Sequence, residues 1–171
     1  IVQDRASLLL QAIWEPEFRD CSYGFRPERN AHQALKRLAE IVTVKHTQWI
    51  VEADIKGFFD HVTHSHLLRF LAHRIADPRF LRIIDRFLKA GVLEDGMFSV
   101  SEQGTPQGGL VSPVLANIYL HYVLDVWFEK RYAKSCRGKA YLVRYADDFV
   151  ACFQLEEDAK RFMVDLRNRL A

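Results

Sequence analysis

Two adjacent carboxylates, Asp147 and Asp148, are the residues of this sequence whose placement points most directly to chemistry. Apolar and aromatic residues rich in β-formers flank the pair, so we expect two short strands joined by a tight turn. Such a turn normally uses Asn-Gly or Asp-Gly, because its central residues need positive φ, and no glycine occurs here. Unit charges about 4 Å apart repel by roughly 1–4 kcal/mol, and a divalent cation would turn this repulsion into ligation. The alternative interpretation is a solvated acidic turn.

A third carboxylate, Asp54, comes at the end of a predicted strand over residues 49–55. Alternation along the strand places Ile50, Glu52 and Asp54 on one face. If this strand neighbours the hairpin, Asp54 and the acidic pair meet at one edge of a sheet. Such a cluster can hold two Mg²⁺ ions about 3.5–4 Å apart, the arrangement used for in-line displacement at phosphorus. Glu52 lies one pleat back, so we expect it to be solvated.

The elements that must position these carboxylates follow from periodicity and capping signals. Asp77 suits a helix N-cap, Pro78 the first helical position and Gly91 the residue after the helix. In the last predicted helix, one stripe carries Ala159, Phe162, Met163, Leu166 and Leu170. We expect helices at residues 1–15, 28–44, 63–75, 78–90, 112–131 and 156–171, and a hairpin at 92–100 that turns at Asp95 and Gly96. This irregular alternation predicts an α+β fold with helices on one face of an antiparallel sheet.

Composition sets wide limits. The chain has 171 residues, of which 49% are hydrophobic and 27% charged, which is ordinary for a globular domain with its own core. The net charge of +2 argues only weakly for any partner. Three cysteines (Cys21, Cys136 and Cys152) form no C-x-x-C pair, which favours a reducing, cytoplasmic environment. No apolar run approaches transmembrane length, so we predict no membrane partner.

Both ends of the chain fall inside predicted helices. The N-terminus has no initiator methionine and no signal-peptide pattern, and the C-terminal helix has no cap. We therefore expect the sequence to be a fragment of a longer protein. The sequence does not indicate an oligomeric state.

Four stretches, in a fixed order, resemble the motifs of one family. They are SYGFRP at residues 22–27, DIKGFFDHV at 54–62, GTPQGGLVSPVLANIYL at 104–120 and YADD at 145–148. Together they identify the chain as a member of the group II intron type of bacterial reverse transcriptases. The resemblance implies a right-hand polymerase palm, an antiparallel sheet backed by helices, plus part of the fingers. It places partial fingers at residues 1–48 and a truncated palm at 49–171, without the thumb.

The resemblance also implies an activity and its cofactors. An RNA-directed DNA polymerase extends a DNA primer along an RNA template, using dNTPs and two Mg²⁺ ions, which Mn²⁺ can replace. Asp54 and Asp147 would hold both metals, and Asp148 would support the site with less direct contact. Ile55, directly after Asp54, belongs to the implied metal-binding set.

Three further residues would meet the incoming nucleotide. Phe59 matches the position of the gate whose bulky ring excludes a ribose 2′-hydroxyl. Gln107 matches the glutamine that lies over the nucleotide, and Gly108 would let the backbone approach it closely. The competing interpretations are an apolar core position for Phe58 and Phe59 and an ordinary helix lead-in for the loop before Ser112.

Basic residues give weaker indications of nucleic-acid contact. Arg26 either meets template or phosphate, or braces its own loop through its five N–H donors. A basic run that includes Lys130, Arg131, Lys134 and Arg137 either follows a phosphate backbone or forms a solvated segment.

A second class of function is a maturase-type module that binds and stabilises structured intron RNA. The acidic triad favours the enzyme, since clustered carboxylates would repel the phosphates of a purely bound RNA. We expect the isolated 171-residue segment to fold but to be inactive, because the basic finger motif and the thumb are missing from it.

Overall fold

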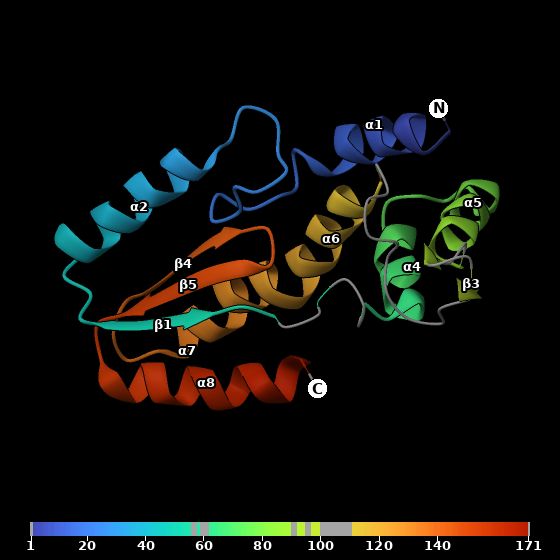
Figure 1. The fold of residues 1–171 in the computed structure, drawn as a ribbon. Helices are drawn as coiled ribbons and strands as arrows, with labels where there is room; N and C mark the ends of the chain where they lie inside the picture. The colour runs from blue at the N-terminus through green and yellow to red at the C-terminus, as the bar shows by residue number, and fades with distance from the viewer. Residues whose placement is uncertain are drawn as a thin grey trace. The chain divides into compact units, whose positions relative to one another are not determined.

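The computed structural model describes residues 2–55, 58, 62–89, 92–94, 97–99 and 111–170, with the backbone alone for 92–94 and 97–99. The chain divides into two units, Ile1–Phe18 with Lys56–Tyr119 and Arg19–Ile55 with Leu120–Ala171. Figure 1 shows the elements of each unit. The predicted division into fingers and palm follows different boundaries and remains a prediction.

The first unit is mainly helical. It contains α1 (Val2–Trp14), α4 (His64–Ala72), α5 (Pro78–Lys89), most of α6 (Ser112–Leu120) and the two-stranded hairpin of β2 (Val92–Glu94) and β3 (Met97–Ser99). The Asp77 carboxylate accepts a hydrogen bond from the Arg79 amide at 2.8 Å, which confirms the predicted N-cap. The antiparallel register pairs Leu93 with Phe98, as the predicted hairpin requires. Its turn residues Asp95 and Gly96, and Gly91, lie outside the described residues.

The second unit contains a three-stranded antiparallel sheet. Its strands are β1 (Trp49–Ala53), β4 (Ala140–Tyr145) and β5 (Asp148–Phe153), in the order β1-β5-β4. This arrangement confirms the predicted α+β class and the two strands that flank the acidic pair. It also confirms that the strand before Asp54 is a direct neighbour of the hairpin.

Helices cover both faces of this sheet, so the prediction of helices on one face alone is wrong. Helix α2 (Ala31–Thr43) begins with a capping box, in which Asn30 and Gln33 exchange side-chain and backbone hydrogen bonds. Ala34 and Ile41 of α2 pack against Val143 and Cys152 of the sheet. The sheet is thus enclosed between α2 on one side and the C-terminal helices on the other (Figure 1).

The helical segment that begins with α6 is longer than predicted, and two of its turns are π-helical and therefore wider than α-helical turns. It continues through the π-helical turns η1 (His121–Asp125) and η2 (Phe128–Tyr132) into α7 (Ala133–Ser135), so Lys134, beyond the predicted helix end at residue 131, is helical. The buried Tyr132 explains the extension, because its hydroxyl donates to the Asp158 carbonyl at 2.6 Å. None of the described helices is long and apolar enough to span a membrane.

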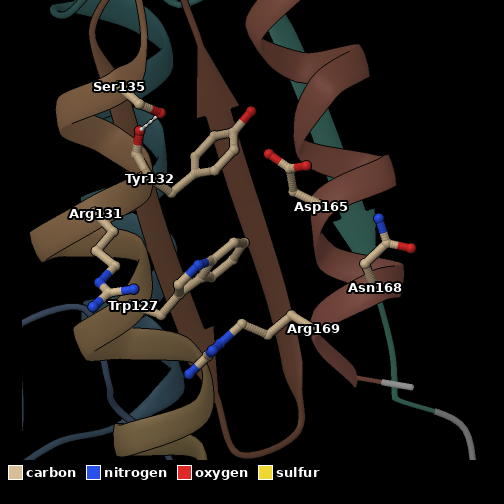
Figure 2. Close-up of a pocket in the computed structure, with 7 residues that line it drawn as sticks. All are labelled: Trp127, Arg131, Tyr132, Ser135, Asp165, Asn168 and Arg169. Carbon is tan, nitrogen blue, oxygen red and sulfur yellow. Dashed lines mark hydrogen bonds between the residues drawn. The ribbon is translucent and has the colours of Figure 1, made fainter.

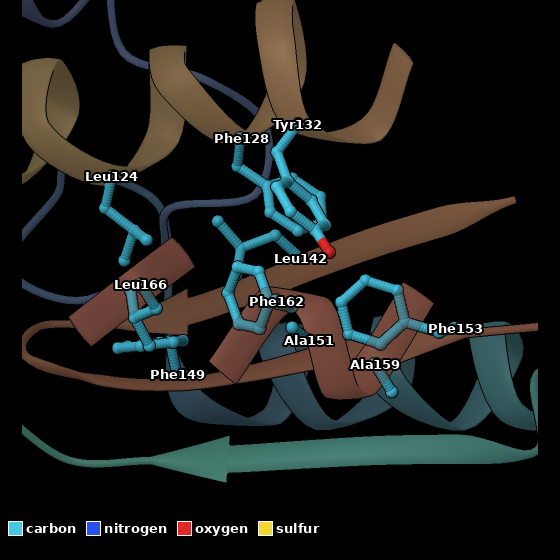
Figure 3. Close-up of a cluster of buried hydrophobic side chains, with 10 residues drawn as sticks. All are labelled: Leu124, Phe128, Tyr132, Leu142, Phe149, Ala151, Phe153, Ala159, Phe162 and Leu166. Atoms are coloured by element: carbon cyan, nitrogen blue, oxygen red, sulfur yellow. The ribbon is translucent and has the colours of Figure 1, made fainter. Parts of the chain in front are cut away.

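Helix α8 (Glu156–Leu170) closes the main core of this unit. Figure 3 shows that its buried side chains meet aromatic residues from η2 and β5. The Phe162 ring lies 5.1 Å from the Tyr132 ring and 5.3 Å from the Phe153 ring, measured between centroids. Met163 and Leu170 of the predicted stripe are exposed instead, at 45% and 39%, because the narrow sheet covers only one side of the helix.

Phe162 and Met163 offer a matched test of this core. We expect Phe162→Ala to lower the free energy of unfolding by about 3–5 kcal/mol, because it leaves a cavity among buried rings. Met163→Ala, one residue along the same helix, should change it by less than about 0.5 kcal/mol, as exposed positions do. Urea denaturation followed by circular dichroism measures both. Equal losses in the two variants would contradict the assigned orientation of α8.

Candidate active site

The turn between β4 and β5 carries the acidic pair. Tyr145 and Asp148 pair across the ladder, which leaves Ala146 and Asp147 as the two turn residues. Ala146 has φ of 59°, in the left-handed region that favours glycine. An alanine in that region costs about 1–2 kcal/mol. The hairpin therefore forms where predicted, and it keeps a conformation that its sequence disfavours locally.

Asp54 reaches the same end and face of the sheet as Asp148. Ala53 pairs with Phe149, so continuing this register by one residue sets Asp54 opposite Asp148. Val51, Ala53 and Phe149 face the main core, and alternation turns Asp54 and Asp148 to the other side. The structure thus brings together residues that are far apart in the sequence.

The charges of Asp54 and Asp148 act on the carboxyl group of Asp147. The pKa of Asp147 is raised above its ordinary value, first because the side chain is partly buried and further because Asp148 and Asp54 are negatively charged. A hydrogen bond from its own backbone amide and the positive charge of Arg144 act in the opposite direction. Asp54 and Asp148 themselves are exposed. The site therefore concentrates negative charge that a bound cation would neutralise.

The donor set suits Mg²⁺, which prefers carboxylate oxygens. Within the described parts of the chain, however, no three acidic, histidine or cysteine side chains are grouped as a ready-made metal site. Ile55 is half-buried and its side chain packs against the main core, so only its backbone carbonyl is chemically able to ligate a metal. Metal binding by Asp54, Ile55, Asp147 and Asp148 remains a prediction.

The predicted nucleotide contacts Phe59, Gln107 and Gly108 lie outside the described residues. The neighbouring Phe58 is described and is 5% exposed. Its ring meets that of Tyr119 edge-on, with 6.0 Å between centroids, as the core interpretation of Phe58 predicts.

The basic residues divide into two groups. Arg26 is buried, and its guanidinium donates to the carbonyls of Arg19 at 2.8 Å and Ser22 at 2.9 Å, which favours the loop-bracing interpretation. The other four predicted nucleic-acid contacts, Lys130, Arg131, Lys134 and Arg137, are exposed. Arg137 pairs with Glu157 at 3.0 Å. A role in nucleic-acid binding stays a prediction for all five.

Sequence reasoning missed a buried ion pair beside the turn. Arg144 of β4 and Asp125 of η1 are both 0% exposed, and their side chains are 2.6 Å apart at the closest pair of atoms. His121 nearby has its pKa lowered to about 4, mainly by burial, so it stays neutral at pH 7. The sequence contained one indication of this ion pair. Leu142 faces the core, and alternation along the strand places Arg144 on the same face. A charge on a core face requires a partner.

A pocket of about 420 Å³ lies elsewhere in this unit, between the η2 region and α8 (Figure 2). It is lined by Trp127, Arg131, Tyr132, Ser135, Asp165, Asn168 and Arg169. Arg169 already covers the Trp127 ring at 5.6 Å and donates to the Val123 carbonyl. None of the three carboxylates lines this pocket, so it is distinct from the acidic site.

A helix-backed antiparallel sheet with carboxylates at one end is the arrangement expected of a polymerase palm. Residues 2–171 match the reverse transcriptase (RNA-dependent DNA polymerase) family, and the chain belongs to that family. Group II intron-encoded protein LtrA of Lactococcus lactis subsp. cremoris is 44% identical over 125 residues, which are 71% of this chain and 20% of that protein. This similarity confirms the group II intron type that the motifs predicted.

Two further comparisons concern the length and the fold of the chain. Protein YkfC of Escherichia coli is 34% identical over 179 residues, covering 88% of this chain and 47% of YkfC. A structure of apo telomerase from Candida tropicalis aligns with a TM-score of 0.63 over 96% of this chain and 36% of that one, at 16% identity, which shows a shared fold. The chain thus spans less than half the length of LtrA and of YkfC.

The raised pKa of Asp147 predicts a stability effect with a definite sign. The folded state binds this proton more tightly than the unfolded state, so the ionised carboxylate costs stability at pH 7. We expect Asp147→Asn to raise the melting temperature at pH 7 in EDTA, with the gap closing as the pH falls toward the ordinary value of 3.8.

Magnesium should reduce the difference in melting temperature between Asp147→Asn and the wild type. Because a bound cation removes the repulsion, Mg²⁺ should raise the melting temperature of the wild type more than that of Asp147→Asn. Differential scanning fluorimetry with and without Mg²⁺ measures both effects, and Glu52→Gln, on the same face one pleat back, is the matched control. A lower melting temperature for Asp147→Asn in EDTA would argue against electrostatic strain at the turn.

Proposed function

We propose that the full-length protein containing this chain is an RNA-directed DNA polymerase whose palm site is formed by Asp54, Asp147 and Asp148. The proposal rests on the β1–β5 register, whose last pair is Ala53 with Phe149. Extended by one residue, this register sets Asp54 opposite Asp148, next to the turn that contains Asp147. Membership of the reverse transcriptase family supports it.

In this proposal the oxygen of the primer 3′-hydroxyl attacks the α-phosphorus of a dNTP and forms a new phosphodiester bond. The bond from the α-phosphorus to the oxygen that bridges the α- and β-phosphates breaks, pyrophosphate leaves, and the hydroxyl proton passes to solvent. Asp54 and Asp147 would hold two Mg²⁺ ions through carboxylate oxygens, the Ile55 carbonyl could add another oxygen, and Asp148 would support the site. The ions, or Mn²⁺ in their place, would lower the pKa of the attacking hydroxyl and stabilise the leaving oxygen. Phe59 limits the space at the sugar, while Gln107 and Gly108 border the nucleotide.

The proposed partners are an RNA template, a DNA primer, dNTPs and structured intron RNA, in the cytoplasm of a bacterium. Lys130, Arg131 and Lys134 are exposed on consecutive helical turns, where their charges are able to meet phosphates. This exposed basic surface favours a second candidate function, a maturase-type module that stabilises folded intron RNA. One full-length protein can carry both functions, since the carboxylates and the basic surface are different residues.

Primer extension separates the two functions. In the full-length protein with Mg²⁺, an RNA template and dNTPs, Asp147→Asn should reduce extension at least about a thousandfold, equivalent to roughly 4 kcal/mol of barrier. RNA affinity, measured by filter binding, should stay near the wild-type value, because removing a negative charge does not weaken phosphate contacts. Glu52→Gln should extend normally. Undiminished polymerisation by Asp147→Asn would end the catalytic assignment and leave the maturase function.

The sugar gate gives an independent test. Phe59→Val in the full-length protein should increase incorporation of ribonucleotides relative to deoxyribonucleotides, because a smaller side chain leaves room for the 2′-hydroxyl. Competition between rNTP and dNTP on one template measures the ratio, with Phe58→Leu as the control for a neighbouring buried ring. An unchanged ratio would assign Phe59 to the core.

A further inference from the structure

The strained turn at Ala146 is held by a buried guanidinium. One terminal nitrogen of Arg144 donates to the Ala146 carbonyl at 2.7 Å. The rest of the guanidinium forms a fork with Asp125, from Nε to Oδ1 at 2.8 Å and from Nη2 to Oδ2 at 2.6 Å. Neither side chain is exposed. A single rigid group therefore ties η1 to the backbone of the turn that carries Asp147.

The loop before α2 completes this arrangement. The Arg144 amide donates to the Cys21 carbonyl at 2.7 Å, and the Tyr23 amide donates to the Arg144 carbonyl at 2.9 Å. The Ser22 hydroxyl accepts from Arg144 Nη2 at 2.8 Å. Ser22 thus forms a parallel bridge with Arg144 at the outer edge of β4, immediately before the turn.

Gly24 brings the same loop against the turn itself. A Cβ atom at Gly24 would lie 2.3 Å from the Ala146 nitrogen and 3.0 Å from the Tyr145 carbonyl carbon. Both neighbours are backbone atoms, so any side chain at Gly24 has to displace the turn or the loop. The φ angle of Gly24 lies outside the left-handed region, so close approach, and not backbone conformation, requires the glycine.

We propose that Arg144 and Asp125, with Gly24, are positioning residues that set the place of Asp147 for catalysis; this inference rests on the proposed polymerase function. A buried ion pair is a poor source of stability, since well-packed apolar residues often replace one at no cost. An apolar pair cannot donate a hydrogen bond to the Ala146 carbonyl. Arg144 is therefore needed to hold the turn in position through its hydrogen bond to the Ala146 carbonyl.

The double variant Arg144→Met with Asp125→Leu tests this in the full-length protein. It removes both charges together, so neither is left buried and unpaired. We expect a melting temperature close to wild type, a kcat for primer extension lower by roughly 10- to 100-fold, and a several-fold higher Mg²⁺ concentration for half-maximal rate. Primer–template affinity should not change. A purely structural role would not shift the Mg²⁺ dependence.

Two smaller changes keep the test decisive if the double variant fails to fold. Gly24→Ala removes no hydrogen-bonding group, yet it should lower kcat and raise the Mg²⁺ requirement by pushing on the turn. Gly138→Ala is the matched control, because the three atoms nearest to its Cβ would all belong to the side chains of Leu155 and Gln154, at 3.0 Å or more. Arg144→Lys, which keeps the charge but loses the fork, should recover only part of the rate.

The outcomes separate this inference from the proposed function. If wild type extends primers and Asp147→Asn does not, the polymerase function stands. Wild-type kcat and Mg²⁺ dependence in folded Arg144→Met/Asp125→Leu, or in folded Gly24→Ala, would then overturn the positioning role alone. If wild type fails to extend any primer, the proposed function fails first.

Discussion

The pairing of β1 with β5 is the interaction on which the site depends. It sets Asp54 beside the hairpin that carries Asp147 and Asp148, although Asp54 belongs to a different part of the sequence. Backbone hydrogen bonds fix this register, and a slip of one residue would turn Asp54 to the opposite face. The aromatic core beneath the sheet resists such a slip, because it requires Val51, Ala53, Phe149 and Ala151 on its own side.

The two faces of the sheet differ in what they contact. One face rests on a layer of rings from η2, β5 and α8, which supplies apolar burial (Figure 3). The same face holds the buried Arg144 against Asp125. The other face presents the carboxylates at one end and is covered by α2 farther along. The proposed site thus lies at the end of the sheet, and the core keeps the strands in place.

Several local features of the second unit act against stability in the same small region. Ala146 takes a left-handed conformation, Asp147 is partly buried among like charges, and Arg144 is wholly buried. Strain of this kind persists when the surrounding structure holds it, and it is concentrated at functional sites. Under the proposed polymerase function these costs share one explanation, since a metal-dependent site needs negative charge held in a fixed place.

The sequence alone predicted most of the elements of this protein and the family to which it belongs. Alternation and flanking β-formers predicted the hairpin around the acidic pair, the Asp77 and Pro78 signals predicted α5, and the motif order predicted the family. These features are local or are read directly as residue types, so no contact between distant segments was needed to find them.

The tertiary structure decided which distant residues support the turn. The contacts of Asp125, Ser22 and Gly24 with Arg144 and the turn were invisible in the sequence, because each joins segments that no local pattern relates. The narrow buried stripe of α8 and the helical extension past Tyr132 also depended on packing. Local propensity selects elements, whereas burial and hydrogen bonding between elements select their exposed faces, their ends and the partners of their charges.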